Sequence, residues 1–381
     1  MKRKITEISV FEFFLCMFVI LIHLLSEGVD GSMYVEGYPK WSVMSIIFYS
    51  VTRLTTFAVP AFIFTSALKM FYKYGERKFH YLRFLWDRFK KIYIPYLIAV
   101  TAYYIIFCFV MNFEEFTPFS FQKLIACIVT SDISAQFYFI VLIVQFYLLM
   151  PLWMLISKKK SFVFTSCIVF FAFAITIASR MWFPVLDGEK FGYAAQIFTM
   201  HKTFTSYLIF WILGMYVGLY YESFARLMDH SKPLIYAGWL LLAIAHCVLS
   251  YMKFGGLIHY TLEPFIVVFF CFFSMFGFYI YAKNLTFALE SKGKGFLTSI
   301  SRASYDIYLI HCLIITIMFR ILYELEVMDV FARFAYNAVT TYTLSIVLCV
   351  LWATIYDNLR AMHNRNSAIR ARKIARRKRY L

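Results

Sequence analysis

The sequence predicts an all-α polytopic membrane protein, a bundle of about ten transmembrane helices. Two observations indicate this class. Hydrophobic residues make up 62% of the 381 residues and charged residues only 15%, whereas soluble proteins carry about 25% charged residues. The apolar residues also gather in runs of roughly 20, the length of a helix that crosses the hydrocarbon core. The composition therefore excludes a soluble enzyme, a disordered chain and a nucleic-acid-binding domain.

Ten apolar runs are long enough to be spans: residues 8–27, 43–68, 92–111, 137–156, 162–179, 204–221, 234–251, 262–282, 305–323 and 334–356. An even number places both termini on the same side. We expect a transmembrane domain over residues 1–357 and a basic tail over residues 358–381. Between the third and fourth runs, Phe121, Leu124 and Ile128 recur at helical spacing, which predicts a helix lying in the membrane interface.

The distribution of the 38 Lys and Arg residues indicates the orientation, because basic residues concentrate in cytoplasmic loops. If the N-terminus is cytoplasmic, most of them fall on the cytoplasmic side, and the exterior segments hold only Lys40, Lys123, Arg180, Lys190, Lys202, Lys253 and Arg333. Both termini are therefore expected in the cytoplasm. The basic tail would then lie against anionic membrane lipid or, alternatively, dock another protein.

The eight cysteines fall almost entirely inside apolar runs and show no metal-ligand spacing. Buried cysteines without such spacing behave as small hydrophobic residues. We therefore expect no metal site and no disulfide framework.

The first span carries two ionisable residues, Glu12 and His23. Their separation of eleven residues places them on nearly the same face of a helix, roughly 16 Å apart along its axis. Ionisable groups inside a span usually face a polar interior or a substrate path. His23 is therefore a candidate functional group, although a histidine hydrogen-bonded to a neighbouring helix would look the same in the sequence.

The second span contains Arg53, seven residues before Pro60. Arginine stays charged, so Arg53 needs a carboxylate, a backbone carbonyl or a wet cavity. Pro60 removes a helix hydrogen bond and is expected to kink the helix. The pair fits a cavity wall and fits plain helix packing equally well.

The segment 69–91 holds eight basic residues, and Arg88, Lys90 and Lys91 directly precede the third span. This charge is explained by topology alone, or by a cytoplasmic cradle for an anionic ligand such as a phosphate. The ninth span opens with residues 304–311, SYDIYLIH. Ser304, Tyr308 and His311 share one face of that helix, which gives a second polar stripe.

Four motifs resemble those of the acyltransferase family 3 membrane proteins. They are the end of the first span at residues 23–25, HLL; residues 57–66, FAVPAFIFTS; the basic run into residues 94–96, IPY; and the run at 304–311. The resemblance covers about the whole chain and is strongest to the branch linked to biofilm poly-N-acetylglucosamine. Glu12 stands where the family usually has Arg, and Ala67 stands where it has Gly.

The resemblance implies an O-acyltransferase of a bacterial cell membrane. Acyl-CoA would be the co-substrate, with no cofactor bound, and a cell-surface glycan or polysaccharide the acceptor. His23 would be the general base, oriented through intervening groups by Glu12, with Arg53 or Tyr305 at the oxyanion and His311 as a further catalytic residue.

The phosphates of acyl-CoA would lie on Arg88, Lys90 and Lys91. Two alternatives stay open from the sequence. The chain could export a polysaccharide, or it could serve as a scaffold among the components of a polysaccharide synthase.

Overall fold

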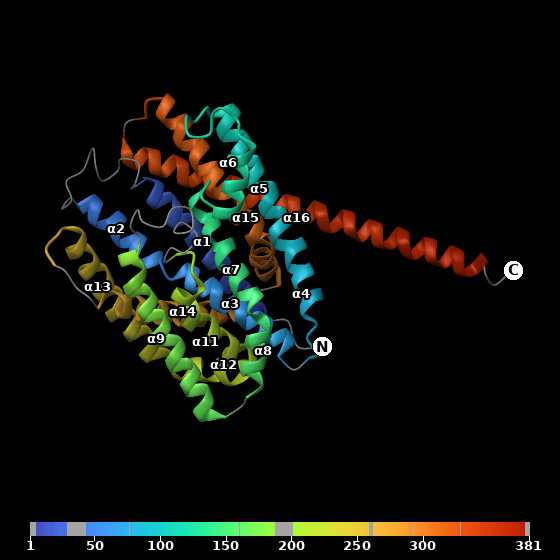
Figure 1. The fold of residues 1–381 in the computed structure, drawn as a ribbon, viewed down its shortest axis with the longest axis horizontal. Helices are drawn as coiled ribbons and strands as arrows, with labels where there is room; N and C mark the ends of the chain where they lie inside the picture. Colours follow the sequence, from blue (N-terminus) through green and yellow to red (C-terminus); the bar gives the residue numbers. More distant parts are fainter. Residues whose placement is uncertain are drawn as a thin grey trace.

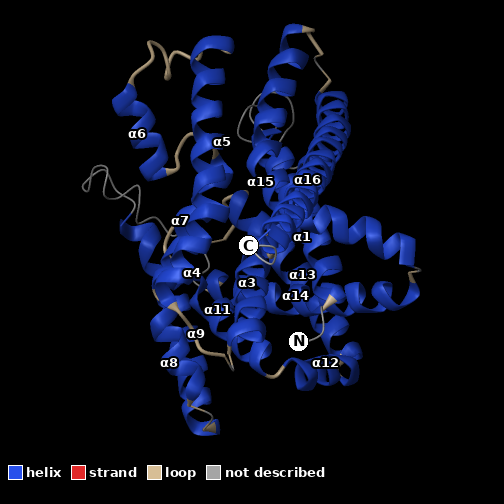
Figure 2. Ribbon diagram, turned by 90° about the vertical axis from the view of Figure 1, so that its right-hand side faces the viewer, coloured by secondary structure: helices blue, strands red, loops and turns tan. Residues whose placement is uncertain are grey.

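The computed structural model describes residues 5–28, 43–75, 77–159, 161–186, 201–258, 262–289, 291–327 and 329–377. Within these ranges every regular element is a helix (Figure 2). In the described part of the chain, eight helices are long and apolar enough to cross a membrane, or up to ten if each of two bent helix pairs is one span. This confirms the predicted membrane helix bundle. Residues 2–4, Lys40 and Lys190, which entered the prediction of orientation, lie outside the described residues.

The first half of the chain forms the following helices. They are α1 (Thr6–Gly28), α2 (Val43–Thr55), α3 (Ala58–Tyr74), α4 (Tyr81–Arg88), α5 (Ile94–Ile105), α6 (Phe121–Thr130), α7 (Tyr138–Leu148), α8 (Met150–Lys158) and α9 (Phe162–Leu186). The second half consists of α11 (Leu208–Leu219), α12 (Tyr221–His230), α13 (Lys232–Phe254), α14 (Glu263–Ala288), α15 (Ser291–Glu324) and α16 (Val330–Arg377). Figure 1 shows α1, α3 and α15 in the middle of the bundle.

The second span is broken rather than kinked at its proline. Helix α2 ends at Thr55 and α3 begins at Ala58. The hydroxyls of Thr55 and Thr56 donate to backbone carbonyls of the last turn of α2, that of Thr56 to the carbonyl of Arg53 at 2.7 Å. Pro60 follows in the first turn of α3, where a missing N–H removes no helix hydrogen bond. The break therefore precedes the proline, and it places Arg53 at the end of a helix.

The third span is longer than the sequence predicts. Residues Tyr81–Val110 form one candidate span, in which a π-helical turn at Phe89–Tyr93 joins α4 to α5. Six of the eight basic residues of the segment 69–91 therefore lie in helices, and Arg77 and Lys78 lie in the connection between α3 and α4. Lys69 belongs to α3, Arg88 ends α4, and Lys91 lies in the π-helical turn. Their side chains have fixed positions relative to the bundle.

Two other spans are bent. Helix α6 meets the segment Ala135–Leu148 at 54°, so the helix predicted at 121–128 exists and is joined to the next span. Helix α12 turns by 104° from the segment Phe204–Leu219. Because α12 carries Glu222, Arg226 and Asp229, we treat it as lying outside the spanning segments. Asp229 accepts from Lys283 of α14 at 2.5 Å, and this contact lowers the pKa of the Asp229 carboxyl below its usual value.

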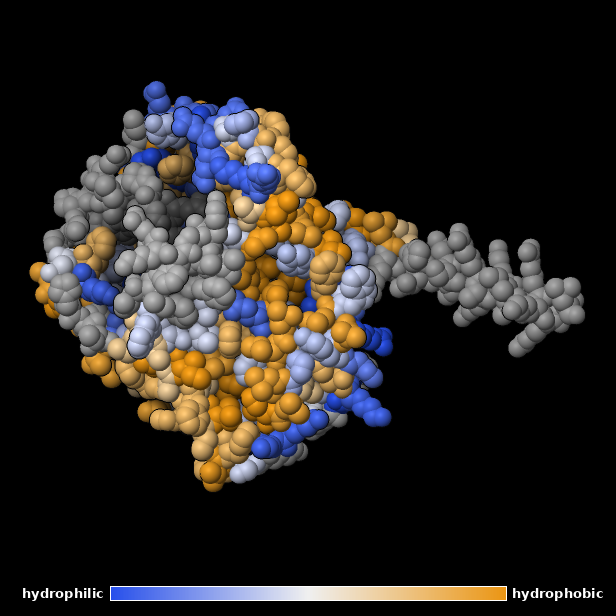
Figure 3. Space-filling view, viewed as in Figure 1, coloured by the Kyte–Doolittle hydropathy of each residue, from blue (hydrophilic) through white to orange (hydrophobic). Residues whose placement is uncertain are grey.

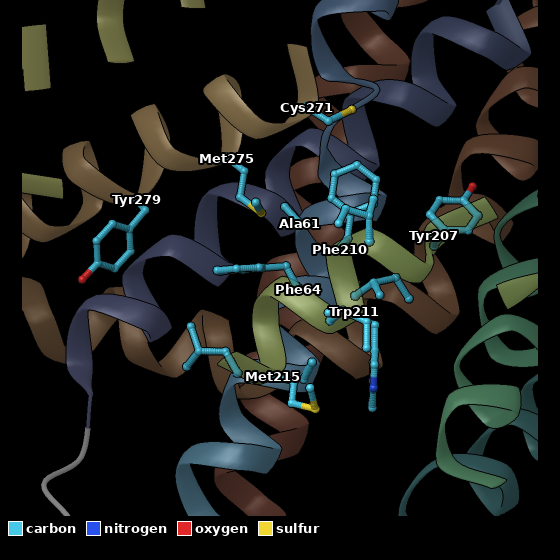
Figure 4. Packing of buried hydrophobic residues seen from close by; sticks show 14 of the residues in the cluster. Ala61, Phe64, Tyr207, Phe210, Trp211, Met215, Cys271, Met275 and Tyr279 are labelled. Atoms are coloured by element: carbon cyan, nitrogen blue, oxygen red, sulfur yellow. The ribbon is translucent and has the colours of Figure 1, made fainter. Parts of the chain in front are cut away.

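Helices α3 and α11 pack closely against each other. Gly214 and Gly218 of α11 lie four residues apart and face the backbone of α3, where a Cβ atom at Gly218 would lie 2.5 Å from the carbonyl oxygen of Leu68. Small residues at this spacing let membrane helices approach closely. Beside this contact, Trp211 stacks on Phe146 with ring centroids 4.5 Å apart. Figure 4 shows Trp211 and Met215 of α11 in the apolar core with Ala61 and Phe64 of α3.

The outer surface is apolar where lipid would contact it. In Figure 3 a broad hydrophobic region lies between hydrophilic residues at the upper edge and others at the lower right. Large apolar side chains are exposed along α9 and α13, among them Phe170, Trp182 and Leu241. Helix α16 extends beyond the bundle (Figure 1) and is continuous from Val330 to Arg377. The predicted tail over residues 358–381 is thus, up to Arg377, a helical extension of the last span.

Candidate active site

An internal cavity of about 290 Å³ lies between α1, α3, α15 and the segment that leads into α7. Six of the residues singled out in the sequence line it: Glu12, His23, Arg88, Lys91, Tyr305 and His311. They come from three separate spans, as the resemblance to the family implies. The cavity is therefore the place where the predicted site residues meet.

One end of the cavity is charged. The buried carboxylate of Glu12 forms an ion pair with Lys69 of α3, and Ser301 lies 3.4 Å from its second oxygen. The guanidinium of Arg88 lies over the rings of Phe84 and Tyr147, at 5.3 and 5.6 Å. Because Lys69 neutralises Glu12, Arg88 and Lys91 leave this end with a net positive charge.

The other end holds two histidines from different helices. The rings of His23 and His311 are both buried, with centroids 5.2 Å apart. Nδ1 of His311 lies 3.0 Å from the carbonyl oxygen of Ile307. Since a carbonyl can only accept, this nitrogen carries the proton and Nε2 of the neutral ring is an acceptor. The thiol of Cys312 lies 3.3 Å from that Nε2.

These three side chains could also hold a metal ion. One ligand atom each from His23, His311 and Cys312 lies within 4.8 Å of the other two. Two imidazoles and a thiolate form a donor set suited to zinc. No sequence motif marks this group, because His23 and His311 are almost three hundred positions apart, whereas the ligands of ordinary zinc motifs come in pairs only a few residues apart.

A network of tyrosines fixes α15 around His311. The Tyr103 hydroxyl accepts from the Leu313 N–H at 2.8 Å and donates to the Leu309 carbonyl at 3.0 Å. It thus bridges two backbone groups one helical turn apart, on either side of His311. The side-chain amide of Gln136 also donates to this hydroxyl, at 2.9 Å. The network holds the imidazole of His311 at a defined height along α15.

The remaining tyrosines of the motif at 304–311 contact backbone carbonyls. The Tyr305 hydroxyl donates to Ile92 at 2.6 Å, and the Tyr308 hydroxyl to Gln136 at 2.5 Å. Tyr305 therefore lines the cavity, but its proton is directed to the third span. As an oxyanion donor, which was one of its expected roles, it would first have to leave this carbonyl.

Two of the singled-out residues lie elsewhere. The Lys90 ammonium lies over the Trp86 ring at 5.3 Å, on the exposed side of the π-helical turn. Arg53 lines a second cavity, of about 440 Å³, together with Arg180, His246, Lys253 and Glu263. It does not line the cavity of His23, so the expected role of Arg53 at the oxyanion has no support in this geometry.

Sequence reasoning also missed functional candidates. Lys69 and Gln136 line the first cavity, as does Ser66 of the motif at 57–66 that the sequence had already indicated. Lys69 follows the apolar run that ends at residue 68, although α3 continues to Tyr74 and its C-cap Gly75, and Gln136 directly precedes the run that begins at residue 137. The spacing of Gly214 and Gly218 was a usable signal for the α3–α11 contact.

The fold is a multi-pass helix bundle, and its cavity holds a buried histidine pair at one end and cationic side chains at the other. Together these features are those of a membrane-embedded enzyme of group transfer. The comparison with known families is consistent with this. The profile of acyltransferase family 3, described as "Acyltransferase domain", matches residues 5–357. The chain belongs to this family, and it is a multi-pass membrane acyltransferase.

Two similar curated proteins come from bacteria. A "Putative membrane-bound acyltransferase YfiQ" of Bacillus subtilis (strain 168) is 25% identical over 312 residues, which cover 81% of this chain and 80% of that protein. A "Probable poly-beta-1,6-N-acetyl-D-glucosamine export protein" of Staphylococcus epidermidis is 22% identical over 321 residues, covering 84% and 83%. No solved structure matches the chain.

Proposed function

We propose that the protein transfers an acyl group from cytoplasmic acyl-CoA to a hydroxyl of an extracytoplasmic glycan or polysaccharide. The observation that carries this proposal is the single cavity with cationic side chains at one end and His23 with His311 at the other. The distribution of Lys and Arg along the chain supports a cytoplasmic position for the cationic end. The histidine pair then lies nearer the exterior.

The donor would bind with its phosphates on Arg88 and Lys91, with Lys69 beside them. Arginine and lysine at a cavity mouth suit phosphate oxygens. Glu12, at the cationic end, and His23 are about 16 Å apart along α1, a distance that the extended pantetheine arm can bridge. The thioester carbonyl would thus reach the buried imidazoles, where water is largely excluded.

In the transfer itself, the acceptor oxygen forms a bond to the thioester carbonyl carbon. His23 takes the hydroxyl proton, the carbon–sulfur bond breaks, and the departing thiolate of coenzyme A receives that proton from His23. His311 lies against His23 and would stabilise the imidazolium through its Nε2 acceptor. Nothing in this sequence of steps requires a covalent acyl-enzyme.

Radiolabelled acyl-CoA and purified protein test the proposal. His23→Gln is expected to lower transfer by about a hundredfold or more, the usual contribution of a general base. Arg88→Gln and Lys91→Gln are expected to raise KM for acyl-CoA. Lys90→Gln is the matched control, because Lys90 contacts Trp86 outside the cavity. If His23→Gln leaves O-acylation unchanged, the proposal fails.

Export of a polysaccharide is the second candidate function, supported by the printed name of the Staphylococcus epidermidis relative. The two functions predict different phenotypes for loss of the gene. Loss of an exporter leaves polymer inside the cell, whereas loss of the transferase leaves exported polymer that lacks acyl groups. Transfer by purified protein would also exclude a role as a mere scaffold for a polysaccharide synthase.

A further inference from the structure

The second cavity lies directly beside the first. Val59 and Tyr138 line both cavities. On α1, neighbouring residues face different cavities, since Ile22 lines the second and His23 the first. The second cavity is formed by the last turn of α2, the end of α13 and the start of α14. By the direction of α1 and α3, it therefore lies at the end of the bundle opposite the Glu12–Lys69 ion pair.

The second cavity carries excess positive charge. Lys253 forms an ion pair with Glu263, so these two charges cancel. Arg53 and Arg180 also line the cavity, and among the described residues neither forms an ion pair with a carboxylate. With its histidines neutral, the described lining of the cavity therefore carries the charge of two guanidinium groups.

Both arginines are held in position by uncharged groups. The Arg53 guanidinium lies over the Tyr49 ring at 4.7 Å, and its buried Nε has no hydrogen-bond partner among the described residues. Nε of Arg180 donates to the Ser206 carbonyl at 3.1 Å, and its guanidinium lies over the Tyr207 ring at 5.3 Å. Rings and carbonyls orient a guanidinium without neutralising it, so both groups are ready to bind an anion.

We infer that the second cavity binds the acceptor through an anionic substituent, a phosphate or a carboxylate, held by Arg53 and Arg180. Arginine pairs with such oxyanions through two parallel hydrogen bonds, and the partly exposed Tyr138 ring offers a flat surface for a sugar face. The shared wall at Val59 and Tyr138 then brings an acceptor hydroxyl next to His23. This inference rests on the proposed transferase function and adds that the acceptor is acidic rather than a neutral glycan.

Binding to the purified full chain in detergent tests the inference without requiring turnover. The probes are two matched pairs, a phosphorylated disaccharide against the same disaccharide, and digalacturonate against its methyl ester. Titration followed by tryptophan fluorescence is expected to show at least about tenfold tighter binding of one acidic probe than of its neutral partner, as for one charge-assisted contact. The two pairs distinguish phosphate from carboxylate.

Variants assign the binding to the cavity. Arg53→Gln and Arg180→Gln are each expected to reduce the preference for the acidic probe by about tenfold. Arg320→Gln should leave it unchanged, because Arg320 is exposed and pairs with Glu324 on α15. Arg53→Lys, which keeps the charge but loses the two-pronged contact, should give an intermediate value.

The outcomes separate this inference from the proposed function. His23→Gln should bind the acidic probe as the unaltered protein does and yet transfer no acyl group. Equal binding of acidic and neutral probes by the unaltered protein, a comparison that needs no variant to fold, overturns the inference. So does a preference that survives in the folded Arg53→Gln and Arg180→Gln proteins. Either result would leave transfer to a neutral acceptor intact.

Discussion

The contact between α3 and α11 gives a prediction whose size follows from the geometry. In Gly218→Ala, the added Cβ would lie 2.5 Å from the backbone oxygen of Leu68, whereas ordinary van der Waals contact begins at 3.4 Å. A backbone oxygen on a packed helix cannot rotate away, so the two helices must separate by roughly 1 Å. Such overpacking destabilises by about 1–3 kcal/mol. We expect a lower midpoint of unfolding when the protein is titrated with SDS.

Gly277→Ala is the matched control. Gly277 lies in α14, and the nearest side-chain atom to an added Cβ is 3.7 Å away, on Tyr236. Here alanine fits, and its better helix propensity makes the change neutral or stabilising by up to about 1 kcal/mol. The two variants, alike in chemistry, should therefore differ in unfolding free energy by about 1–4 kcal/mol.

The same change should also reach the active site. Lys69 follows Leu68 on α3, so a shift of α3 moves the Lys69 ammonium relative to Glu12. We expect slower acyl transfer by Gly218→Ala even in the fraction that stays folded, because misplacement by about 1 Å can cost a hundredfold in rate. Equal stability and activity of the Gly218 and Gly277 variants would refute the reasoning.

Three further predictions concern polar contacts. Lys69→Met removes the ion-pair partner of the buried Glu12 and should destabilise the protein by about 1–3 kcal/mol, less than for a fully buried pair because Lys69 is half exposed. Adding Glu12→Gln should restore part of this loss in an unfolding assay. If the two changes in unfolding free energy simply add in the double variant, that would count against the ion pair. Tyr103→Phe removes the hydroxyl that bridges Leu309 and Leu313 of α15 and should destabilise the protein by about 1–3 kcal/mol. It should also lower kcat without changing KM for acyl-CoA. A change confined to KM would contradict the role of this bridge in positioning His311. Asp229→Asn should lower thermal stability at neutral pH, because Lys283 lowers the pKa of the Asp229 carboxyl. The stabilisation by this ion pair is present above the carboxyl pKa of the unfolded chain and is lost as the pH falls through the pKa of the folded protein. If the variant remained less stable than the unaltered protein in acid, that would argue against this cause.

The helical architecture could be predicted because the bilayer imposes it. A run of apolar residues such as 8–27 must be helical in lipid, and α1 accordingly spans Thr6–Gly28. Helix ends were less predictable. The break at Thr56 depends on side-chain hydrogen bonds from threonines to the last turn of α2, and the third span continues into Arg88 because a charged side chain there can reach the cavity.

The site was predicted in part for a similar reason. His23 and His311 could be identified because an ionisable group inside a span needs a polar environment, and both lie at the same cavity. Arg53 met the same criterion, and it has its own cavity. The spacing of polar residues along a helix shows which face of the helix is polar. It does not show which of two neighbouring cavities that face will line.

The wall formed by Val59 and Tyr138 has a consequence for the cell. A membrane protein with a cavity at each end could conduct protons through water in the two cavities, and such a leak would dissipate the membrane potential. A valine and a tyrosine ring between the two chambers form a short insulating layer at the point where the voltage would otherwise drop through water. We expect that only the acceptor hydroxyl has to pass this layer to reach His23, while both large substrates stay on their own sides, so catalysis and electrical insulation depend on the same two side chains.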